Sequence, residues 1–321
     1  MSEKHITIFL MRVLVTGGTG YLGAAIVREL ATRGHRPIVF ARGASKAGLP
    51  GVPMDGDIRD RRALTLAAQS VDAVIHTAAL VTIWRRNSGE FDTVNVGGLH
   101  NVLDVVAAAV IPRVVYTSTF LALPPNGSRV PIKGNDYQRS KTTARADAVK
   151  AQAQGAPLII LYPGVVYGPG RATEGNLVAR LLRDHRNGAL PGIVGPERIW
   201  SFSYVDDVAA AHVEAIERPH AQGEYIIGGE NAPQMRLFQM ATAAGLGGGL
   251  PRSIPLPLAR AAGAVDEVRA RWFGRTPLIT RATVEIFSRD WSMDSTRSVR
   301  ELNHRITPLE AGVRATLASL A

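Results

Sequence analysis

Cysteine is absent from the 321-residue sequence. Its absence excludes disulfide bonds, zinc–thiolate sites and cysteine nucleophiles, and it is typical of proteins in a reducing compartment. We therefore expect a cytoplasmic protein. The sequence also lacks any run of 18 apolar residues, so we expect no transmembrane helix and no membrane partner.

The N-terminal segment, MSEKHITIFLMRVLVTGG, lacks the features of a secretory signal. Arg12 interrupts its apolar run, and no small-residue cleavage site follows. The segment leads directly into an expected strand and a glycine turn. Met11 is a second candidate for the native start, in which case residues 1–10 form a tail or a strand extension.

Lysine is scarce, with five lysines against 32 arginines, yet the net charge is +10. A basic protein can bind nucleic acid, membranes or phosphorylated small molecules. The arginines are spread along the chain singly or in pairs such as Arg61–Arg62, without a basic arm or a basic stretch with interleaved aromatics. This spread disfavours nucleic-acid binding and indicates surface charge together with an anionic small ligand. No spacing of His, Asp and Glu suggests a metal site.

The first half alternates short apolar runs with helical patterns. Strands are expected at 12–17, 36–42, 52–57, 72–79, 113–119 and 157–164, and helices at 21–34, 59–70, 95–110 and 137–154. Continuous apolar strands alternating with helices indicate an α/β fold with a doubly wound (Rossmann) parallel sheet, covered on both faces.

Beyond residue 170 the pattern becomes mostly helical, with Gly and Pro clusters at 188–196 and 245–257. Helices are expected at 176–187, 206–218, 233–245, 258–272, 278–288 and 308–320. Residues 206–218 and the segment GEYIIGG are expected to return to the sheet. We expect a Rossmann domain of residues 1–172 joined by 201–229, and a smaller substrate-binding lobe of residues 173–200 and 230–321.

A glycine turn, TGGTGYLG, lies between the first expected strand and the first expected helix. Gly17, Gly20 and Gly23 have the spacing G-x-x-G-x-x-G. Residues without Cβ let the backbone approach a pyrophosphate, and the helix N-terminus offers free N–H groups and a positive dipole end. The context predicts dinucleotide binding, and the alternative is a tight structural turn.

The residues after the second and third strands bear on which dinucleotide is bound. A carboxylate at the end of the second strand would bind the two ribose hydroxyls of NAD. Arg42 stands there instead, followed by Lys46, which favours NADP(H), with NAD(H) as the alternative. The alternative is that Arg42 is a solvated surface arginine without a ligand. Asp57 could accept from the adenine amino group or cap the next helix, a cap that would suit Asp60 better.

These segments together resemble the extended short-chain dehydrogenases/reductases over nearly the whole chain. The similar motifs are TGGTGYLG, GDIRD, VIHTAA, NVGGLHNVLD, VVYTSTF, YQRSK, LYPGVVYGPG, SFSYVDDVAAAH and EYIIGGEN. Within that superfamily the chain most resembles the dihydroflavonol-reductase-like, 3β-hydroxysteroid-dehydrogenase-like and hopanoid-associated branch.

The resemblance implies a catalytic role for Tyr137 and Lys141, which lie one helical turn apart. The Lys141 ammonium would lower the phenol pKa and hold the nicotinamide ribose, so that Tyr137 serves as general acid or base. The hydroxyl that holds the substrate oxygen is expected to be Thr119, since 117 and 119 share one face of a regular strand. Ser118 is the alternative.

The resemblance also implies contacts to the cofactor from Gly17, Thr19, Gly20, Tyr21, Leu22, Gly23, Ile58, Ala78, Ala79, Pro163, Val165 and Val166. Asn95 would order the proton path or cap its helix. His76 is expected to be a strand-end residue near the cofactor. Asp206 and Asp207 are expected to start the helix that follows, as an N-cap and a first-turn acid.

A fairly apolar ketone, aldehyde or secondary alcohol is the expected substrate. Similar nucleotide-sugar epimerases and dehydratases, the competing class, place an arginine five residues before the valine of VDD, where this chain has Trp200; Arg198 lies two residues away. Trp84 and Phe120 could add to an apolar pocket, although ordinary packing explains each equally well. The short loop 120–136 predicts an open pocket.

A second alternative is a regulatory protein that senses NADP without catalysis. Such members of the superfamily have lost the catalytic tyrosine, whereas Tyr137 and Lys141 are both present here. We therefore expect an enzyme. A homodimer is a further expectation from the family.

Overall fold

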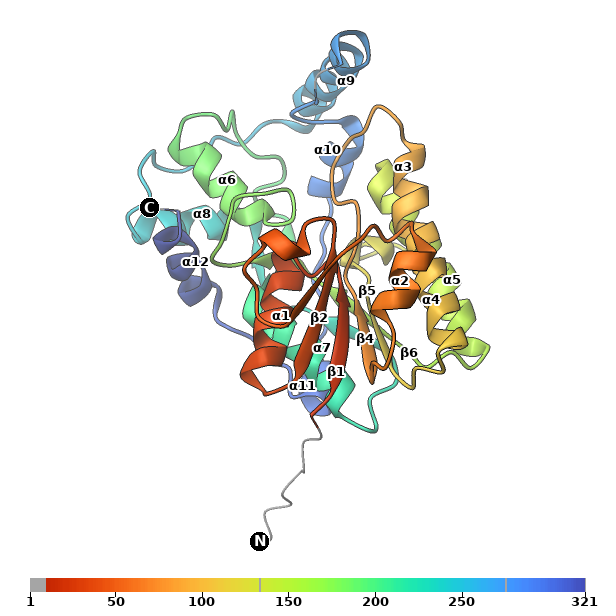
Figure 1. Cartoon of the computed structure of the whole chain (residues 1–321). Coiled ribbons are helices and arrows are strands. Elements are labelled where there is room, and N and C mark those ends of the chain that lie inside the picture. The colour runs from red at the N-terminus through yellow and green to blue at the C-terminus, as the bar shows by residue number, and fades with distance from the viewer. Residues whose placement is uncertain (1–9, 133, 275, 321) are drawn as a thin grey trace, which may run out of the picture.

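The chain folds around a seven-stranded parallel sheet with strand order β3-β2-β1-β4-β5-β6-β9 (Figure 1). The computed structural model describes residues 10–132, 134–274 and 276–320. The strands are β1 (Arg12–Thr16), β2 (Arg36–Ala41), β3 (Val52–Asp55), β4 (Ala73–His76), β5 (Val114–Thr117), β6 (Leu158–Pro163) and β9 (Gly223–Ile227). All six pairings are parallel, which confirms the predicted doubly wound fold.

Helices cover both faces of this sheet because successive residues of each strand point to opposite sides. Val13 and Val15 pack in one core with α1 (Tyr21–Thr32) and α7 (Val205–Glu217). Leu14 packs in a second core with α4 (Gly97–Ala108) and α5 (Asp136–Ala153). Because both faces of the large sheet are buried, its strands are continuous apolar runs in the sequence.

The starts of several helices differ from the sequence interpretation. Asp60 accepts from Ala63 N at 3.1 Å and caps α2 (Arg61–Ala67). From the sequence, this cap is expected to suit Asp60 better than Asp57. A short α3 (Gly89–Phe91) and a π-helical turn, Asp92–Val96, precede α4. The prediction of an aspartate N-cap on α7 is wrong: the cap is Tyr204, and Asp206 and Asp207 lie in the first turn.

A second, three-stranded sheet forms from β7 (Val165–Tyr167), β8 (Ile199–Tyr204) and β10 (Glu230–Pro233), in the order β10-β8-β7. The sequence interpretation missed it, since these strands are three to six residues long. The remaining helices are α6 (Leu177–Arg186), α8 (Gln234–Ala243), α9 (Leu256–Phe273), α10 (Arg281–Phe287), α11 (Thr296–Leu302) and α12 (Leu309–Ala318). Helix α9 projects from the side of the molecule where the strands of the large sheet end (Figure 1).

Candidate active site

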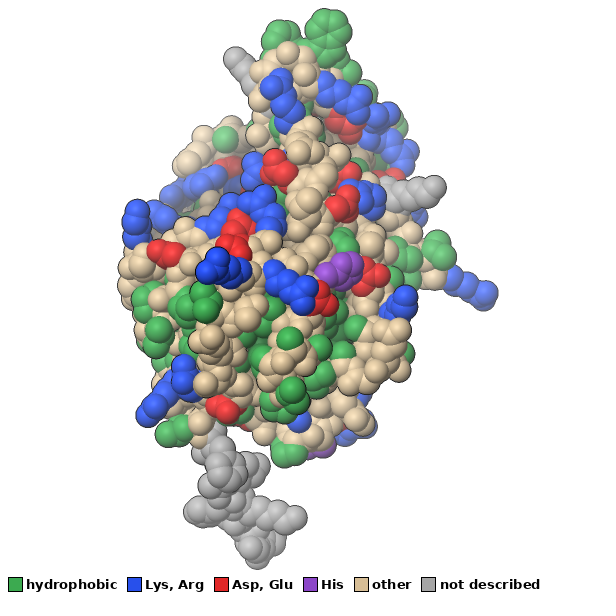
Figure 2. All heavy atoms as spheres, turned by 45° about the vertical axis from the view of Figure 1, so that its right-hand side comes forward, with side chains coloured by type: hydrophobic (Ala, Val, Ile, Leu, Met, Phe, Trp, Pro, Cys, Tyr) green, Lys and Arg blue, Asp and Glu red, His purple; other side chains and the backbone are tan. Residues whose placement is uncertain are grey.

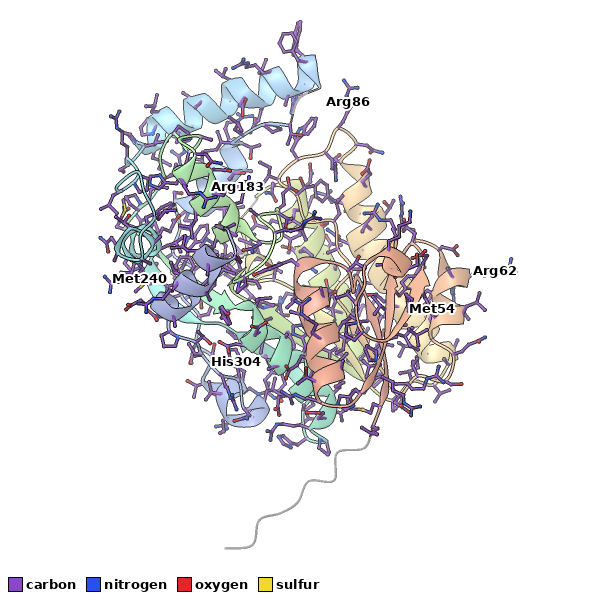
Figure 3. The ribbon with its side chains drawn as sticks, turned by 60° about the vertical axis from the view of Figure 1, so that its left-hand side comes forward. Met54, Arg62, Arg86, Arg183, Met240 and His304 are labelled. Atoms are coloured by element: carbon purple, nitrogen blue, oxygen red, sulfur yellow. The ribbon has the colours of Figure 1, made fainter. Side chains whose placement is uncertain are left out.

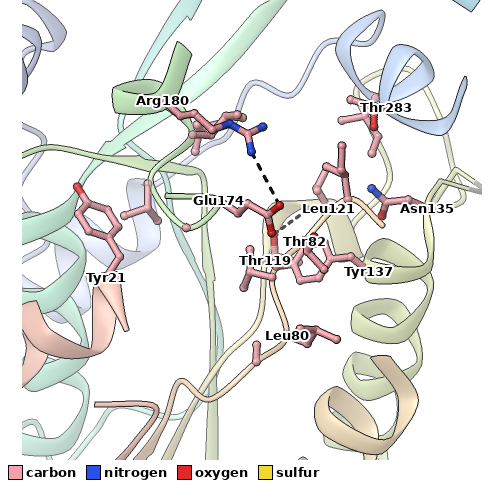
Figure 4. Close-up of a pocket in the computed structure, with 18 of the residues that line it drawn as sticks. Tyr21, Leu80, Thr82, Thr119, Leu121, Asn135, Tyr137, Glu174, Arg180 and Thr283 are labelled. Carbon is pink, nitrogen blue, oxygen red and sulfur yellow. Dashed lines mark hydrogen bonds and ion pairs between the residues drawn. The ribbon is translucent and has the colours of Figure 1, made fainter. Parts of the chain in front are cut away.

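One cavity of about 1660 Å³ follows the carboxyl edge of the large sheet. It begins at the turn between β1 and α1, passes the ends of β4 and β5, and extends to α6, α9 and α10. Carboxyl edges of parallel sheets are the usual binding positions of doubly wound folds. Figure 4 shows part of the cavity, with side chains that converge from both halves of the chain.

Nearly all the predicted site residues line this cavity. They are Gly17, Thr19, Gly20, Tyr21, Leu22, Gly23, Arg42, Asp57, Ile58, Ala78, Ala79, Ser118, Thr119, Phe120, Tyr137, Lys141, Pro163, Val165, Val166 and Trp200. Lys46 and Trp84 do not line it. Lys46 lies in a 3₁₀ turn, Ala44–Lys46, and is exposed.

The glycine turn is too tight for side chains at two of its positions. Gly17 has φ +71°, and a Cβ there would lie 2.7 Å from the Ala78 backbone. A Cβ on Gly23 would lie 2.2 Å from the Gly17 carbonyl oxygen. Gly20 begins α1 without a side-chain cap, so the first N–H groups of this helix are open toward the cavity. The turn therefore fits a pyrophosphate of a dinucleotide.

Asp57 and Arg42 face the part of the cavity beside β2 and β3. Both carboxylate oxygens of Asp57 accept from the Arg59 guanidinium, at 2.9 and 2.7 Å. These hydrogen bonds lower the pKa of Asp57 to about 2, so the carboxylate is charged at neutral pH. Arg42 is exposed and has no salt bridge to a carboxylate in the described part of the chain.

Lys141 is buried on α5, one turn after Tyr137. Its Nζ donates to Tyr116 Oη at 3.0 Å and to the Thr117 carbonyl oxygen at 2.8 Å. Burial lowers the pKa of Lys141 to about 7. Asn135 fixes the start of the helix, since its side chain accepts from Gln138 N at 2.9 Å. The helix cap thus sets the position of both Tyr137 and Lys141 at the cavity.

The acidity of Tyr137 differs from the expectation. Burial raises the pKa of Tyr137 to about 12, while the neighbouring Thr119 hydroxyl acts in the lowering direction. Lys141 is not among the causes of the shift, because its ammonium is directed toward Tyr116 and Thr117. The expected lowering of the phenol pKa by Lys141 is therefore wrong for this structure.

Thr119 and Ser118 both reach the cavity, but not by strand alternation. Strand β5 ends at Thr117, and Thr119 caps a 3₁₀ turn, Phe120–Ala122, by accepting from Leu121 N at 3.3 Å. The argument that 117 and 119 share a strand face therefore does not apply. Ser118 Oγ is buried and has no hydrogen-bond partner among the described residues.

Asn95 connects two parts of the site without lining the cavity itself. Its Oδ1 accepts from Leu80 N at 2.7 Å, and its Nδ2 donates to Ser140 Oγ at 2.8 Å. The side chain thereby joins the loop after β4 to helix α5, which carries Tyr137 and Lys141. Since Val96 and not Asn95 is the N-cap of α4, the capping alternative is wrong.

His76 lies behind the lysine. Its Nδ1 shares a hydrogen bond of 2.7 Å with Thr16 Oγ1, and its ring stacks on Tyr116 at 5.6 Å between centroids. Burial, and then the charge of Lys141, lower the pKa of His76 to about 3. A neutral imidazole therefore supports the tyrosine that receives the Lys141 hydrogen bond.

The far end of the cavity is aromatic and apolar. The ring centroid of Phe120 lies 6.3 Å from that of Trp200 and 5.3 Å from that of Trp291. The ring centroids of Trp200 and Phe287 lie 4.6 Å apart. Trp200 is buried and its Nε1 donates to the Arg289 carbonyl oxygen at 3.1 Å. Sequence reasoning found Phe120 and Trp200 by motif position, but it missed Phe287, which has no motif around it.

A charged pair, which the sequence analysis also missed, lines the cavity on the side of α6. Glu174 and Arg180 lie 4.0 Å apart, and the dashed line between them in Figure 4 marks the pair. Their charges oppose each other, so this wall adds little net charge to the apolar end. Across the described chain, no three His, Asp or Glu side chains group in a way that could hold a metal ion.

The sheet, its nucleotide turn and the tyrosine–lysine helix at one cavity are those of the extended short-chain dehydrogenase/reductase superfamily. Within it, the chain belongs to the NAD dependent epimerase/dehydratase family, whose model matches residues 13–228. The predicted superfamily, and with it an NAD(P)-dependent enzyme of the reductase and dehydrogenase type, is confirmed.

The chain is similar to relatives along nearly its full length. Sterol demethylase protein B of Methylococcus capsulatus is 31% identical, with 91% of this chain and 93% of the relative covered. A 2-alkyl-3-oxoalkanoate reductase of Stenotrophomonas maltophilia is 31% identical, with 97% of this chain and 100% of the relative covered.

Solved structures agree on the fold. The crystal structure of gox2253 matches with a TM-score of 0.80 at 28% identity, covering 96% of this chain and 97% of that chain. UDP-sugar epimerases with bound NAD also share the architecture at 18–23% identity, a likeness that shows the fold alone.

Proposed function

We propose that this protein is an NADP(H)-dependent oxidoreductase that acts on a fairly apolar ketone, aldehyde or secondary alcohol. The observation that carries the proposal is the continuity of one cavity from the glycine turn, past Tyr137 and Lys141, to the aromatic wall of Phe120 and Trp200. The names of the relatives, a sterol demethylase protein and an oxoalkanoate reductase, are in keeping with apolar substrates.

The fit of the residues to a dinucleotide rests on the turn at Gly17 and Gly23, where a Cβ would meet backbone atoms. A bound nicotinamide would supply or accept the hydride. Pro163, Val165 and Val166 would flank it from the ends of β6 and β7. Lys141 would hold the ribose through the N–H groups of its Nζ, which donate to Tyr116 and Thr117 in this structure.

The chain's own residues would handle the proton. Tyr137 Oη would donate it to the carbonyl oxygen during reduction and take it back during oxidation. A phenol whose pKa burial raises to about 12 is protonated at neutral pH and is therefore ready to donate. Thr119, whose hydroxyl interacts with the phenol, would hold the same oxygen, and Ser118 is the alternative donor.

The preference for NADP(H) rests on Arg42. It lines the cavity at the end of β2, is exposed, and would meet a 2′-phosphate where a carboxylate would repel it. Lys46 does not line the cavity, so we omit it from this role. Asp57 remains a proposed ligand of the adenine amino group, although Arg59 already occupies both of its oxygens.

Three wider expectations belong to the same proposal. They are a cytoplasmic location, a homodimer, and a division into a Rossmann domain of 1–172 with 201–229 and a substrate lobe of 173–200 with 230–321. The lack of cysteine supports the first, and the small sheet of β7, β8 and β10 beside the cavity supports a separate substrate lobe.

The test follows NADPH absorbance at 340 nm with aryl ketones, aldehydes, steroid ketones and β-keto acyl compounds, and again with NADH. We expect loss of NADPH with a carbonyl substrate, and slower loss of NADH. Tyr137→Phe should reduce turnover by roughly 10²–10⁴-fold while NADPH still binds. The control is Tyr167→Phe, because that hydroxyl lies outside the cavity and has no partner among the described residues.

Two outcomes would contradict the proposal. Conversion of a UDP- or dTDP-sugar without net loss of NADPH would establish an epimerase or dehydratase, despite the position of Trp200. Tight NADPH binding with no turnover of any substrate would favour the regulatory alternative.

A further inference from the structure

Helix α9 has two apolar faces, of which one is buried. The small residues Ala259, Gly263 and Ala270 form the buried face. A Cβ on Gly263 would lie 2.9 Å from Arg281 N, so α9 approaches the start of α10 closely at this point. The small residues allow α9 to pack closely on α10 along this one face. The helix as a whole projects from the molecule, as Figure 1 shows.

The second apolar face of α9 is exposed and ends in the largest exposed side chains of the region. Trp272 is 81% exposed, Phe273 72% and Leu278 86%. Leu258, Val265 and Val268 continue this face along the helix, each more than half exposed. We call these six residues the α9 tip. Contiguous exposed apolar side chains, unlike scattered ones, mark an interaction surface.

Cations surround the α9 tip. Arg269 and Arg271 lie on α9 itself, and Arg86 lies 3.4 Å from where a Cβ of Gly274 would be, at the helix end. Figure 3 shows Arg86 beside the end of α9, and Figure 2 shows Lys and Arg side chains, in blue, below the hydrophobic side chains at the top of the molecule. None of these three has a salt bridge to a carboxylate in the described ranges.

The acidic residues of this region are already engaged. Residues 256–289 contain six arginines and three carboxylates, a net charge of +3. Asp266 accepts from Leu278 N and Ile279 N, Glu267 pairs with Arg281, and Glu285 pairs with Arg260 and Arg289. The surface that remains for a partner is therefore apolar with a cationic rim.

The α9 tip is continuous with the mouth of the cavity. Leu258, Val265 and Leu278 line the cavity from the side of α9, and Val81 and Ile83 line it from the loop after β4. The same mouth also has two charged side chains of α9, Asp266 and Arg269, in its lining.

We propose that the α9 tip docks on an anionic lipid bilayer. Trp272 and Phe273 have the amphipathic or apolar rings that insert at the headgroup level, and arginines beside them attract anionic headgroups. A protein partner or a second copy would need complementary acidic groups around an apolar hollow, whereas a bilayer supplies both features over any area. The proposal replaces the expectation from the sequence that the protein has no membrane partner; it requires no spanning helix, and no described helix is long and apolar enough to span.

The test is co-sedimentation of the full chain with vesicles of phosphatidylglycerol and phosphatidylcholine, with pure phosphatidylcholine for comparison. We expect binding to the anionic vesicles that falls at least tenfold in Trp272→Ser/Phe273→Ser. Arg86→Gln/Arg271→Gln should weaken binding and flatten its salt dependence. The matched control is Arg62→Gln/Leu66→Ser on α2, which changes one exposed arginine and one exposed leucine outside the cavity.

Fluorescence gives a second measurement that does not depend on pelleting. Trp272 is exposed, whereas Trp200 and Trp291 are buried and Trp84 is half-buried, so vesicles should shift mainly the Trp272 emission to the blue. The shift should be absent in Trp272→Phe. Trp272 and Phe273 do not line the cavity, so NADPH oxidation with a water-soluble substrate should be unchanged in their variants. This separates a failure of docking from a failure of the proposed reaction.

The proposal is overturned if the wild-type protein fails to bind anionic vesicles, or if the tip and control variants bind equally. It is also overturned if light scattering shows a dimer that Trp272→Ser/Phe273→Ser dissociates and vesicles do not bind; the α9 tip would then be covered by a second copy.

Discussion

Lys141 occupies a position that is costly for an ammonium group. It is 3% exposed, and its two hydrogen-bond acceptors, Tyr116 Oη and the Thr117 carbonyl oxygen, carry no formal charge at neutral pH. The pKa near 7 expresses this cost, because burial favours the neutral amine. Residues of this kind are retained for chemistry at the expense of stability.

Replacing this lysine should therefore stabilise the protein while it removes function. Lys141→Met keeps the aliphatic chain and removes the buried ammonium. We expect the free energy of unfolding at pH 7 to rise by about 1–2 kcal/mol, and turnover to be lost. Urea denaturation measures the first and NADPH oxidation the second; a less stable variant would contradict this account of the lysine.

At the level of single residues, the sequence predicted that Tyr137 and Lys141 reach one cavity, but it did not predict their pKa values. Their spacing places both residues on one face of a helix, and the resemblance to the superfamily assigned them as a pair. Burial raises the pKa of Tyr137, and the Lys141 ammonium donates to Tyr116 on the distant strand β5. Neither is visible in a local motif.

At the level of elements, the β1–α1 turn determines whether a dinucleotide can bind. Gly23 sits against the Gly17 carbonyl, and this contact brings the helix close to the strand. The contact also explains why glycine is needed inside a helix, where it otherwise costs about 1 kcal/mol relative to alanine.

Gly23→Ala should push α1 away from the turn, since its Cβ would lie 2.2 Å from that oxygen. We expect loss of NADPH binding and a fall in the free energy of unfolding of roughly 1–3 kcal/mol. Gly97→Ala on α4 is the control, because its Cβ meets only Asp92 O at 3.7 Å, and it should be neutral or stabilising. Cofactor titration and urea denaturation measure both; equal behaviour of the two variants would refute this role for the turn.

Elements with a strong period, or with a place in the alternation of strands and helices, could be predicted, whereas β7 and β10 could not. Helix α5 was expected at 137–154 and runs from Asp136 to Ala153, since its cap and period are local. Strands β7 and β10 have three and four residues, too few to show alternation. Helix α9 was expected, but its exposed second face could not be read without knowing which face packs on α10.

At the level of the whole molecule, buried histidines set the response to acid. Burial lowers the pKa of His76 to about 3 and that of His212 to about 4, and it also lowers the pKa of His304. These side chains stay neutral in the fold but bind protons in the unfolded chain below about pH 6.5. The unfolded state then binds more protons, so stability must fall as the pH drops from 7 toward 4.

His76 and His212 should each cost roughly 2 kcal/mol of stability between pH 7.5 and pH 5. Removing one should reduce this loss by that amount. His212→Gln is suitable because the ring nitrogens form hydrogen bonds with the Thr117 hydroxyl and the Val208 carbonyl oxygen, which an amide can also bond. Urea denaturation at the two pH values measures the difference. The exposed His220→Gln should keep the full loss, and a similar effect of both variants would contradict the assignment.

The last strand of the large sheet, β9, comes late in the chain. It pairs with β6, and residues 164–222 lie between them. At about 5–20 residues per second, a ribosome needs roughly 3–12 s to make this segment. During that time one edge of β6, the edge that later pairs with β9, has no partner strand, and a neighbouring nascent chain can add a strand there. The rate of translation between β6 and β9 therefore affects how much of the protein reaches its folded state, and chaperones that bind extended apolar segments have their target there.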